Sequence, residues 1–217
     1  MQNDGNTPED MDRSDTKPRG RPRGFDRRAA LEAATQLFWR KGHAATSISD
    51  LTRELGIGAP SLYAAFTSKE ALYEEALTFY AAHYGRTVWG GFDAALTARE
   101  AARAYLFDSA TGLTGYAADN PRGCMVTLAA AVSEVPQSLA HDLQAARGAN
   151  YARLLARIER AMREGELPGK LDSAALARFL QSVQAGMSIM ARDGASAQDL
   201  ESVAAIAMAG WDAWTAA

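Results

Sequence analysis

The sequence has very little cysteine, since Cys124 is the only one in 217 residues. A single cysteine excludes an internal disulfide and fits a reducing compartment. The chain also lacks any apolar run near the ~18 residues that cross a bilayer, and its polar, acidic N-terminus lacks the apolar segment of a secretion signal. We therefore expect a cytoplasmic protein with no membrane partner. A hydrophobic content of 47% is ample for a buried core.

The patterns that mark catalytic and metal sites are also missing. His43, His83 and His141 are far apart, and no pair of His or carboxylate residues has the spacing of metal ligands. The sequence contains no Gly-rich phosphate loop and no nucleophile elbow. It therefore predicts that the chain is not an enzyme and has no metal or cofactor.

No segment alternates apolar and polar residues with period two over a useful length, so we expect no strand. Apolar spacings near 3.6 residues, with capping and Gly/Pro signals, predict an all-α fold of about nine helices. Three of these helices lie near the N-terminus, a fourth connects them to the rest of the chain, and five more form a C-terminal bundle. From the fourth onward, the expected helices run from near Lys69 to Gly90, Thr97 to before Asp119, Gly123 to Val135, Pro136 to Glu164, Asp172 or Ser173 to Arg192, and Ser196 to Trp214.

Charge is distributed unevenly along the chain, although the net charge is only −3. Residues 1–16 carry −4, residues 17–69 carry +6, and the remaining residues carry −5. A positive charge confined to one segment is typical of a part that contacts phosphate groups while the rest of the protein does not.

Residues 42–77 have the pattern of two short helices around a glycine turn, followed by a longer helix. Ser47 and Asp50 have the spacing of a capping box at the start of the first short helix. Gly56 follows this helix, where a left-handed residue is needed. The apolar face of the first short helix is formed by Ile48, Leu51 and Leu55.

The second short helix has Pro60 in its first turn, where a missing N–H costs nothing, and Leu62 and Phe66 bury one side of it. Thr67 and Glu70 have the spacing of a capping box for the longer helix. Two short helices around such a turn form a helix-turn-helix, in which the second helix enters the DNA major groove.

With the helix expected over Arg27 to Arg40, this stretch resembles the DNA-binding domain of the TetR family of transcriptional regulators, over about residues 20–80. The resemblance implies a ligand-responsive dimer, a repressor that a small molecule releases from its double-stranded DNA operator. It assigns residues 25–70 to DNA binding and residues 71–217 to ligand binding and dimerisation. The matching residues are Gly56, Ile57, Ser61, Leu62, Tyr63, Phe66, Lys69 and the Glu-Ala-Leu that follows.

Thr46, Tyr63 and Lys69 match family positions that touch the DNA backbone, and each side chain can donate to a phosphate oxygen. The second short helix has unusually small side chains. Alanine and proline can contact a thymine methyl but cannot form bidentate bonds to a base, so we expect modest discrimination per base pair. The other residues expected at the DNA are Ser47, Ser49, Gly58, Ala59, Pro60 and Ser61.

Residues 1–24 form an arm that is first acidic and then basic. The prolines and glycines of Lys17–Gly24 exclude a helix and favour an extended chain. This segment resembles the core of an AT-hook, whose arginines, here Arg19, Arg21 and Arg23, would enter an A·T-rich minor groove. The alternative is a disordered tail that contacts phosphates without register. Residues 1–16 are expected to be disordered.

The last two expected helices carry a wide apolar surface with small residues that permit close approach of helices. A helix-turn-helix normally needs two copies to read two half-sites, which favours an isologous interface between two copies of these helices. The alternative is that the surface belongs to the core of one copy. The predicted interface residues are Phe179, Val183, Val203, Ala207 and Trp211.

The effector pocket is expected at the centre of the C-terminal bundle. Its predicted lining is rich in aromatic residues and methionine, which suits a hydrophobic or aromatic effector of moderate size. Two alternatives stay open: Cys124 at a helix N-terminus as a redox or electrophile sensor, or an architectural DNA-binding protein without an effector. The predicted lining is Tyr80, Tyr84, Tyr105, Ser109, Leu113, Cys124, Met125, Leu128, Tyr151, Gln184 and Met187.

Overall fold

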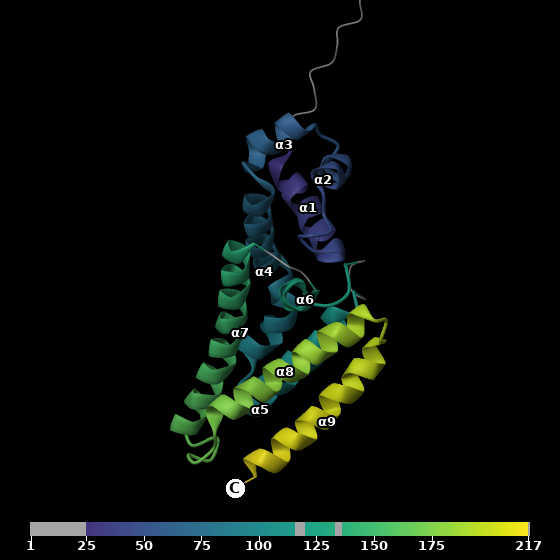
Figure 1. Ribbon diagram of the computed structural model, residues 1–217. Helices are drawn as coiled ribbons and strands as arrows, with labels where there is room; N and C mark the ends of the chain where they lie inside the picture. The colour runs from purple at the N-terminus through teal and green to yellow at the C-terminus, as the bar shows by residue number, and fades with distance from the viewer. Residues whose placement is uncertain (1–24, 116–119, 133–135, 217) are drawn as a thin grey trace, which may run out of the picture.

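The computed structural model describes residues 25–115, 120–132 and 136–216, and the side chains of all of these except residues 130–132. Within these ranges the chain forms nine α-helices and no strand, which confirms the all-α prediction (Figure 1). The helices are α1 (Arg27–Lys41), α2 (Ile48–Leu55), α3 (Ala59–Phe66), α4 (Lys69–Ala94), α5 (Ala98–Leu113), α6 (Met125–Val132), α7 (Gln137–Arg163), α8 (Ser173–Arg192) and α9 (Ala197–Thr215).

Helices α1 to α3 form a head at one end of the molecule, and α4 joins it to the other helices (Figure 1). Asp26 caps α1 by accepting the backbone N–H groups of Arg28 and Ala29. Leu51 of α2 and Leu62 of α3 are fully buried in the core shared with α1 and α4. Burial of these apolar side chains therefore fixes α2 and α3 relative to each other.

Most of the predicted caps are present. Gly56 has φ 64° in the left-handed region, and its N–H donates to the carbonyl of Thr52, which closes α2. Asp172 caps α8. The three observed capping boxes are Ser47 with Asp50, Thr97 with Glu100, and Ser196 with Asp199.

Helix α4 begins at Lys69 as predicted, but its predicted capping box is wrong. Its cap is Ser68, whose Oγ accepts the N–H of Ala71 at 3.0 Å. Thr67 ends α3 instead, with φ 63°. A residue in this conformation cannot occupy the extended N-cap geometry, so Thr67 and Glu70 form no capping box.

The expected end of α4 at Gly90 and Gly91 is also wrong, because the helix continues to Ala94. A Cβ atom at Gly91 would lie 3.1 Å from the Cβ of Ala104 and would collide with the carboxylate of Asp108 on α5. Gly91 thus allows α4 and α5 to pack closely and does not end the helix.

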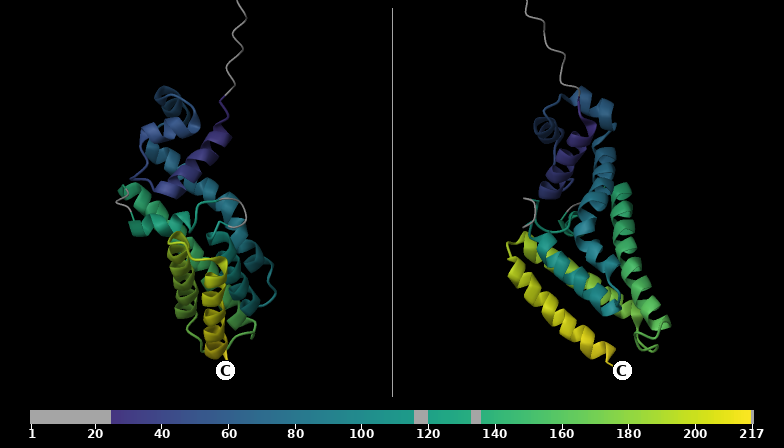
Figure 2. Two further views of the ribbon diagram at one scale, coloured as in Figure 1. Left: turned by 90° about the vertical axis from the view of Figure 1, so that its right-hand side faces the viewer. Right: turned by 180° about the vertical axis from the view of Figure 1, so that it is seen from behind.

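The C-terminal helices form the body of the molecule. Helix α5 packs against α4, α8 and α9, and α7 packs mainly against α8 (Figure 2). Tyr105 of α5 and Trp211 of α9 are almost fully buried within this bundle. Among the helices described, none is both long and apolar enough to cross a membrane.

The buried core of the head continues into the body. It contains Leu51 and Leu62 of the head together with Leu139 and Leu143 of α7. The apolar core is therefore continuous across residue 70. The domain boundary predicted there stays a prediction.

Candidate nucleic-acid interface and effector cavity

Helix α3 lies at the outer end of the head, away from the body (Figure 1). Because Leu62 and Phe66 are buried, Pro60, Ser61 and Tyr63 face outward, and Tyr63 is 45% exposed. The N-cap of α3 is Gly58, which has no side chain to accept the first N–H groups of the helix. Its first backbone N–H groups are therefore available to an anion such as a phosphate.

The other residues predicted to contact DNA at the starts of α2 and α3 differ in their exposure and hydrogen bonding. Ser49 and Gly58 are exposed, while Ala59 is half-buried. Ser47 is exposed, but its hydroxyl donates to Asp50 Oδ2 at 2.9 Å and accepts the Asp50 N–H at 3.0 Å. Ser47 therefore holds the first turn of α2.

The structure corrects the role predicted for Thr46. Its side chain is fully buried, and its hydroxyl donates to the carbonyl of Gly42 at 2.7 Å. The Lys69 Nζ donates to the carbonyls of His43 and Thr46, both at 2.9 Å. Thr46 is thus a loop-holding residue rather than a phosphate donor, and Lys69 fixes the same loop to the start of α4.

Several basic side chains of the head are already paired. Hydrogen bonds from the Ser47 N–H, the Lys41 ammonium and the Ser47 hydroxyl hold the pKa of Asp50 well below the usual range. Arg53 also forms an ion pair with this carboxylate. Much of the uncompensated positive charge of residues 17–69 must therefore lie in the arm, but Arg19, Arg21 and Arg23 are outside the described residues. The other ion pairs of the head are Arg27 with Glu75 and Arg40 with Glu54.

An aromatic cavity of about 250 Å³ lies in the body, walled by α4, α5, α7 and α8. Asn150 and Arg153 of α7 also line this cavity. The sequence did not predict these two residues, because their polar side chains add nothing to an apolar pattern. Arg153 lies over the ring of Trp89, 4.5 Å from its centroid, and forms an ion pair with Asp93. Six predicted residues meet there: Tyr80, Tyr84, Tyr105, Leu113, Cys124 and Gln184.

The remaining predicted pocket residues lie elsewhere. Tyr151 lines a neighbouring cavity between α7 and α8. Met125 and Leu128 line a cavity of about 190 Å³ next to the head. Ser109 and Met187 are fully buried, and the Ser109 hydroxyl donates to the carbonyl of Tyr105 at 2.6 Å. Ser109 therefore does not need a ligand to satisfy its hydroxyl.

The surroundings of two tyrosines of the cavity disfavour their ionised forms. Burial raises the pKa of Tyr80 well above its ordinary value, and the neighbouring Cys124 raises it further. Burial likewise raises the pKa of Tyr105, with a smaller effect from Cys124. A tyrosine is a phenol at neutral pH even with its ordinary pKa, so both side chains offer the cavity a group that can donate a hydrogen bond, and burial preserves this form at higher pH.

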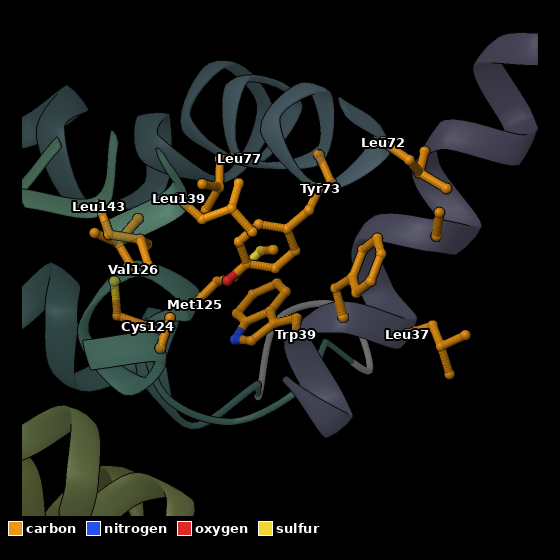
Figure 3. Close-up of a cluster of buried hydrophobic side chains, with 14 of the residues drawn as sticks. Leu37, Trp39, Leu72, Tyr73, Leu77, Cys124, Met125, Val126, Leu139 and Leu143 are labelled. Carbon is orange, nitrogen blue, oxygen red and sulfur yellow. The ribbon is translucent and has the colours of Figure 1, made fainter. Parts of the chain in front are cut away.

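The cavity and the head are joined through Trp39 at the end of α1. Figure 3 shows this indole beside Met125 and the residues of α4. The ring of Trp39 lies edge-on to Tyr80 and Tyr84, with centroids 4.8 and 5.1 Å apart. Its Nε1 donates to the carbonyl of Gly123 at 2.8 Å. The same two tyrosines thus wall the cavity and contact the head.

Two further contacts fix this junction. Arg192, in the last turn of α8, donates to the carbonyls of Trp39 at 2.8 Å and Arg40 at 3.0 Å, which satisfies carbonyls at the end of α1. The N–H of Cys124 donates to Ser188 Oγ at 2.8 Å. Gly123 has φ 81°, a conformation that favours glycine. Helix α8 therefore contacts both the head and the segment that leads into α6.

The predicted dimer residues do not form one exposed surface. Ala207 and Trp211 are buried within the protomer, which corrects their assignment to the interface. Phe179 is 40% exposed, and Val183 and Val203 are half-buried. The sequence prediction omitted four other exposed large apolar side chains of α8 and α9, which are Ile189, Met190, Ile206 and Trp214.

Comparison with known proteins agrees with this arrangement. Residues 30–76 match the bacterial regulatory proteins of the tetR family. The chain is 35% identical over 196 residues to the HTH-type transcriptional repressor ComR of Escherichia coli (strain K12), covering 90% of this chain and 93% of that protein. It is 49% identical over 61 residues to the HTH-type transcriptional repressor BdcR of the same organism, covering 28% of this chain and 31% of that protein.

A solved structure extends the similarity to the whole fold. It is a cysteine mutant of the TetR family transcriptional regulator CifR complexed with 26bp double-strand operator DNA. The two chains are 37% identical with a TM-score of 0.81, covering 88% of this chain and all of the other. The chain belongs to the TetR family of bacterial transcriptional regulators, which confirms the expectation that it is not an enzyme.

Proposed function

We propose that this regulator is a homodimeric repressor that a small hydrophobic or aromatic effector releases from its operator. The observation that carries the proposal is the double role of Tyr80 and Tyr84, which line the aromatic cavity and also contact Trp39 of the head. A ligand that moves these rings must also change the packing of α1. Binding that favours one head position over another shifts the population of the DNA-competent state.

The DNA contacts follow from the exposed face of the head. The α3 face of Gly58, Pro60, Ser61 and Tyr63 would enter the major groove, with Ser49 near its edge. Lys69 would add a positive charge close to the DNA backbone. The CifR structure contains operator DNA, and ComR and BdcR are named repressors, which supports repression as the role of this chain.

The dimer is proposed through α8 and α9. Phe179, Ile206 and Trp214 expose apolar surface on these helices, and a second copy would remove it from water. Two heads joined in this way could reach two half-sites about one helical turn of DNA apart. Binding to chromosomal DNA would place the protein in the cytoplasm.

A cavity-filling variant tests effector release. Ala149 and Ala152 are both exposed residues of α7, but Ala149 lines the aromatic cavity and Ala152 does not. We expect Ala149→Phe to keep operator binding and lose release by effectors, while Ala152→Phe keeps both. The measurement is fluorescence anisotropy of labelled operator across a panel of apolar compounds that raise the unfolding temperature of the protein.

The alternatives make different predictions in the same assay. An architectural DNA-binding protein would keep its operator affinity with every compound, which would refute effector release. A cysteine sensor would release DNA with oxidants or electrophiles, and Cys124→Ser would abolish that response.

A further inference from the structure

The cavity between α7 and α8 differs in chemistry from the aromatic cavity beside it. It has a volume of about 410 Å³ and shares three lining residues with the aromatic cavity: Tyr105, Asn150 and Gln184. The two cavities are therefore neighbours, and an elongated ligand could occupy both. Together they are in the size range of small-molecule sites.

The second cavity is basic. Arg147 of α7 and Arg178 of α8 line it, and none of the described residues that line it is acidic. Neither arginine forms an ion pair with any residue that the structure describes. This is unexpected in a part of the chain with net charge −5 after residue 69. Two guanidinium groups without carboxylates indicate a site for an anion.

One nitrogen of Arg147 provides an independent argument. Its Nη1 is buried and has no hydrogen-bond partner among the described residues. A buried donor without a partner costs free energy, and more so when it is charged. An oxyanion in the cavity would supply the missing acceptor.

The arginines are held in place by their neighbours. Arg178 lies over the ring of Tyr151, 4.6 Å from its centroid. Gln181 Nε2 donates to the backbone carbonyl of Arg147 at 2.9 Å, which ties α8 to α7 at this point. A site whose donors are already positioned loses less conformational freedom on binding.

We propose that the effector is an amphipathic anion: its oxyanion group binds Arg147 and Arg178, and its aromatic or aliphatic body fills the aromatic cavity. A carboxylate is the simplest such group. This inference rests on the proposed function, because it takes the aromatic cavity to be the effector site. It adds the charge of the effector and the two residues that recognise it.

The test uses full-length protein and ligands that differ only in their polar group. Phenylalkanoates from phenylacetate to phenylbutyrate are compared with the alcohols and amines of the same chain length at neutral pH. Affinities are measured by calorimetry, and release of labelled operator by anisotropy. We expect the best carboxylate to bind about tenfold or more tightly than its alcohol, because hydrogen bonds between charged groups are the stronger ones. The amine should bind most weakly.

Three variants connect this preference to the arginines. Arg147→Gln and Arg178→Gln should each reduce the preference for carboxylate over alcohol several-fold, while Arg178→Lys, which keeps the charge, should retain part of it. Arg163→Gln is the matched control, since Arg163 is an exposed residue of α7 that does not line this cavity. Unfolding temperatures without ligand show that each variant is folded.

The outcomes separate this inference from the proposed function. The inference is overturned if no carboxylate binds, if the alcohols bind as tightly, or if both glutamine variants keep the full preference. If an alcohol still releases the operator in any of these cases, the proposed function, release by an effector, is retained. If carboxylates bind with the expected preference but no compound changes operator affinity, the anion site stands and the proposed release is refuted.

Discussion

Ser188 offers a quantitative test of the junction between α6 and α8. Its side chain is fully buried, and its Oγ accepts the N–H of Cys124 at 2.8 Å. In Ser188→Ala this buried N–H loses its partner, which costs about 1–3 kcal/mol. The void left by one oxygen atom adds only about 0.2 kcal/mol. We therefore expect the free energy of unfolding to fall by about 2 kcal/mol.

The control for this substitution is in the same helix. Ser182 is exposed, so Ser182→Ala should change the free energy of unfolding by less than about 0.5 kcal/mol. Urea denaturation of both variants at one protein concentration measures the difference. For a chain of this size, 2 kcal/mol corresponds to a decrease of about 4–8 °C in Tm. Equal stability of the two variants would refute the reasoning that the Cys124 N–H depends on Ser188.

Three further predictions concern the head and the arm. Burial lowers the pKa of His43, and Lys69 lowers it further while Glu70 opposes this. The imidazole therefore stays neutral in the folded state while it takes up a proton near pH 6.5 in the unfolded state, so the free energy of unfolding should fall below about that pH. His43→Phe should flatten this fall in urea midpoints measured from pH 8 to about pH 5. Tyr63→Phe should weaken binding to every DNA sequence about equally. Lys69→Ala should lower the salt slope of DNA binding by about one, and it should also reduce stability because two loop carbonyls lose their donor. If the affinity and the slope are unchanged in a salt titration, neither residue belongs to the DNA interface. Deletion of residues 1–23 should reduce affinity and also abolish a preference for A·T-rich over G·C-rich flanks, whereas equal weakening of both operators in competition binding would leave the arm as a phosphate-binding tail only.

The sequence predicted the features of the fold that depend on neighbouring residues. The capping boxes and the left-handed Gly56 require only a few adjacent residues, so their positions could be read from the sequence. Thr67 and Ser68 both carry a hydroxyl, and only the positive φ of Thr67 decides that Ser68 caps α4. Gly91 resembles a helix end until its contact with α5 is known.

The site was predicted less completely because it depends on tertiary contacts. Thr46 matches a family position, but its burial and its bond to Gly42 arise from the packing of the head. Arg147 and Arg178 look like ordinary surface arginines in the sequence. Only the packing of α7 against α8 places both of them on one cavity.

Reciprocal binding measures most directly whether the aromatic cavity and the head are coupled. The operator Kd is determined with and without a saturating effector, and the effector Kd is determined for free and for operator-bound protein. If Tyr80, Tyr84 and Trp39 connect the two sites, both affinities should fall by the same factor, about 5- to 150-fold for a typical coupling. A compound that binds in the aromatic cavity and leaves the operator Kd unchanged would contradict the coupling.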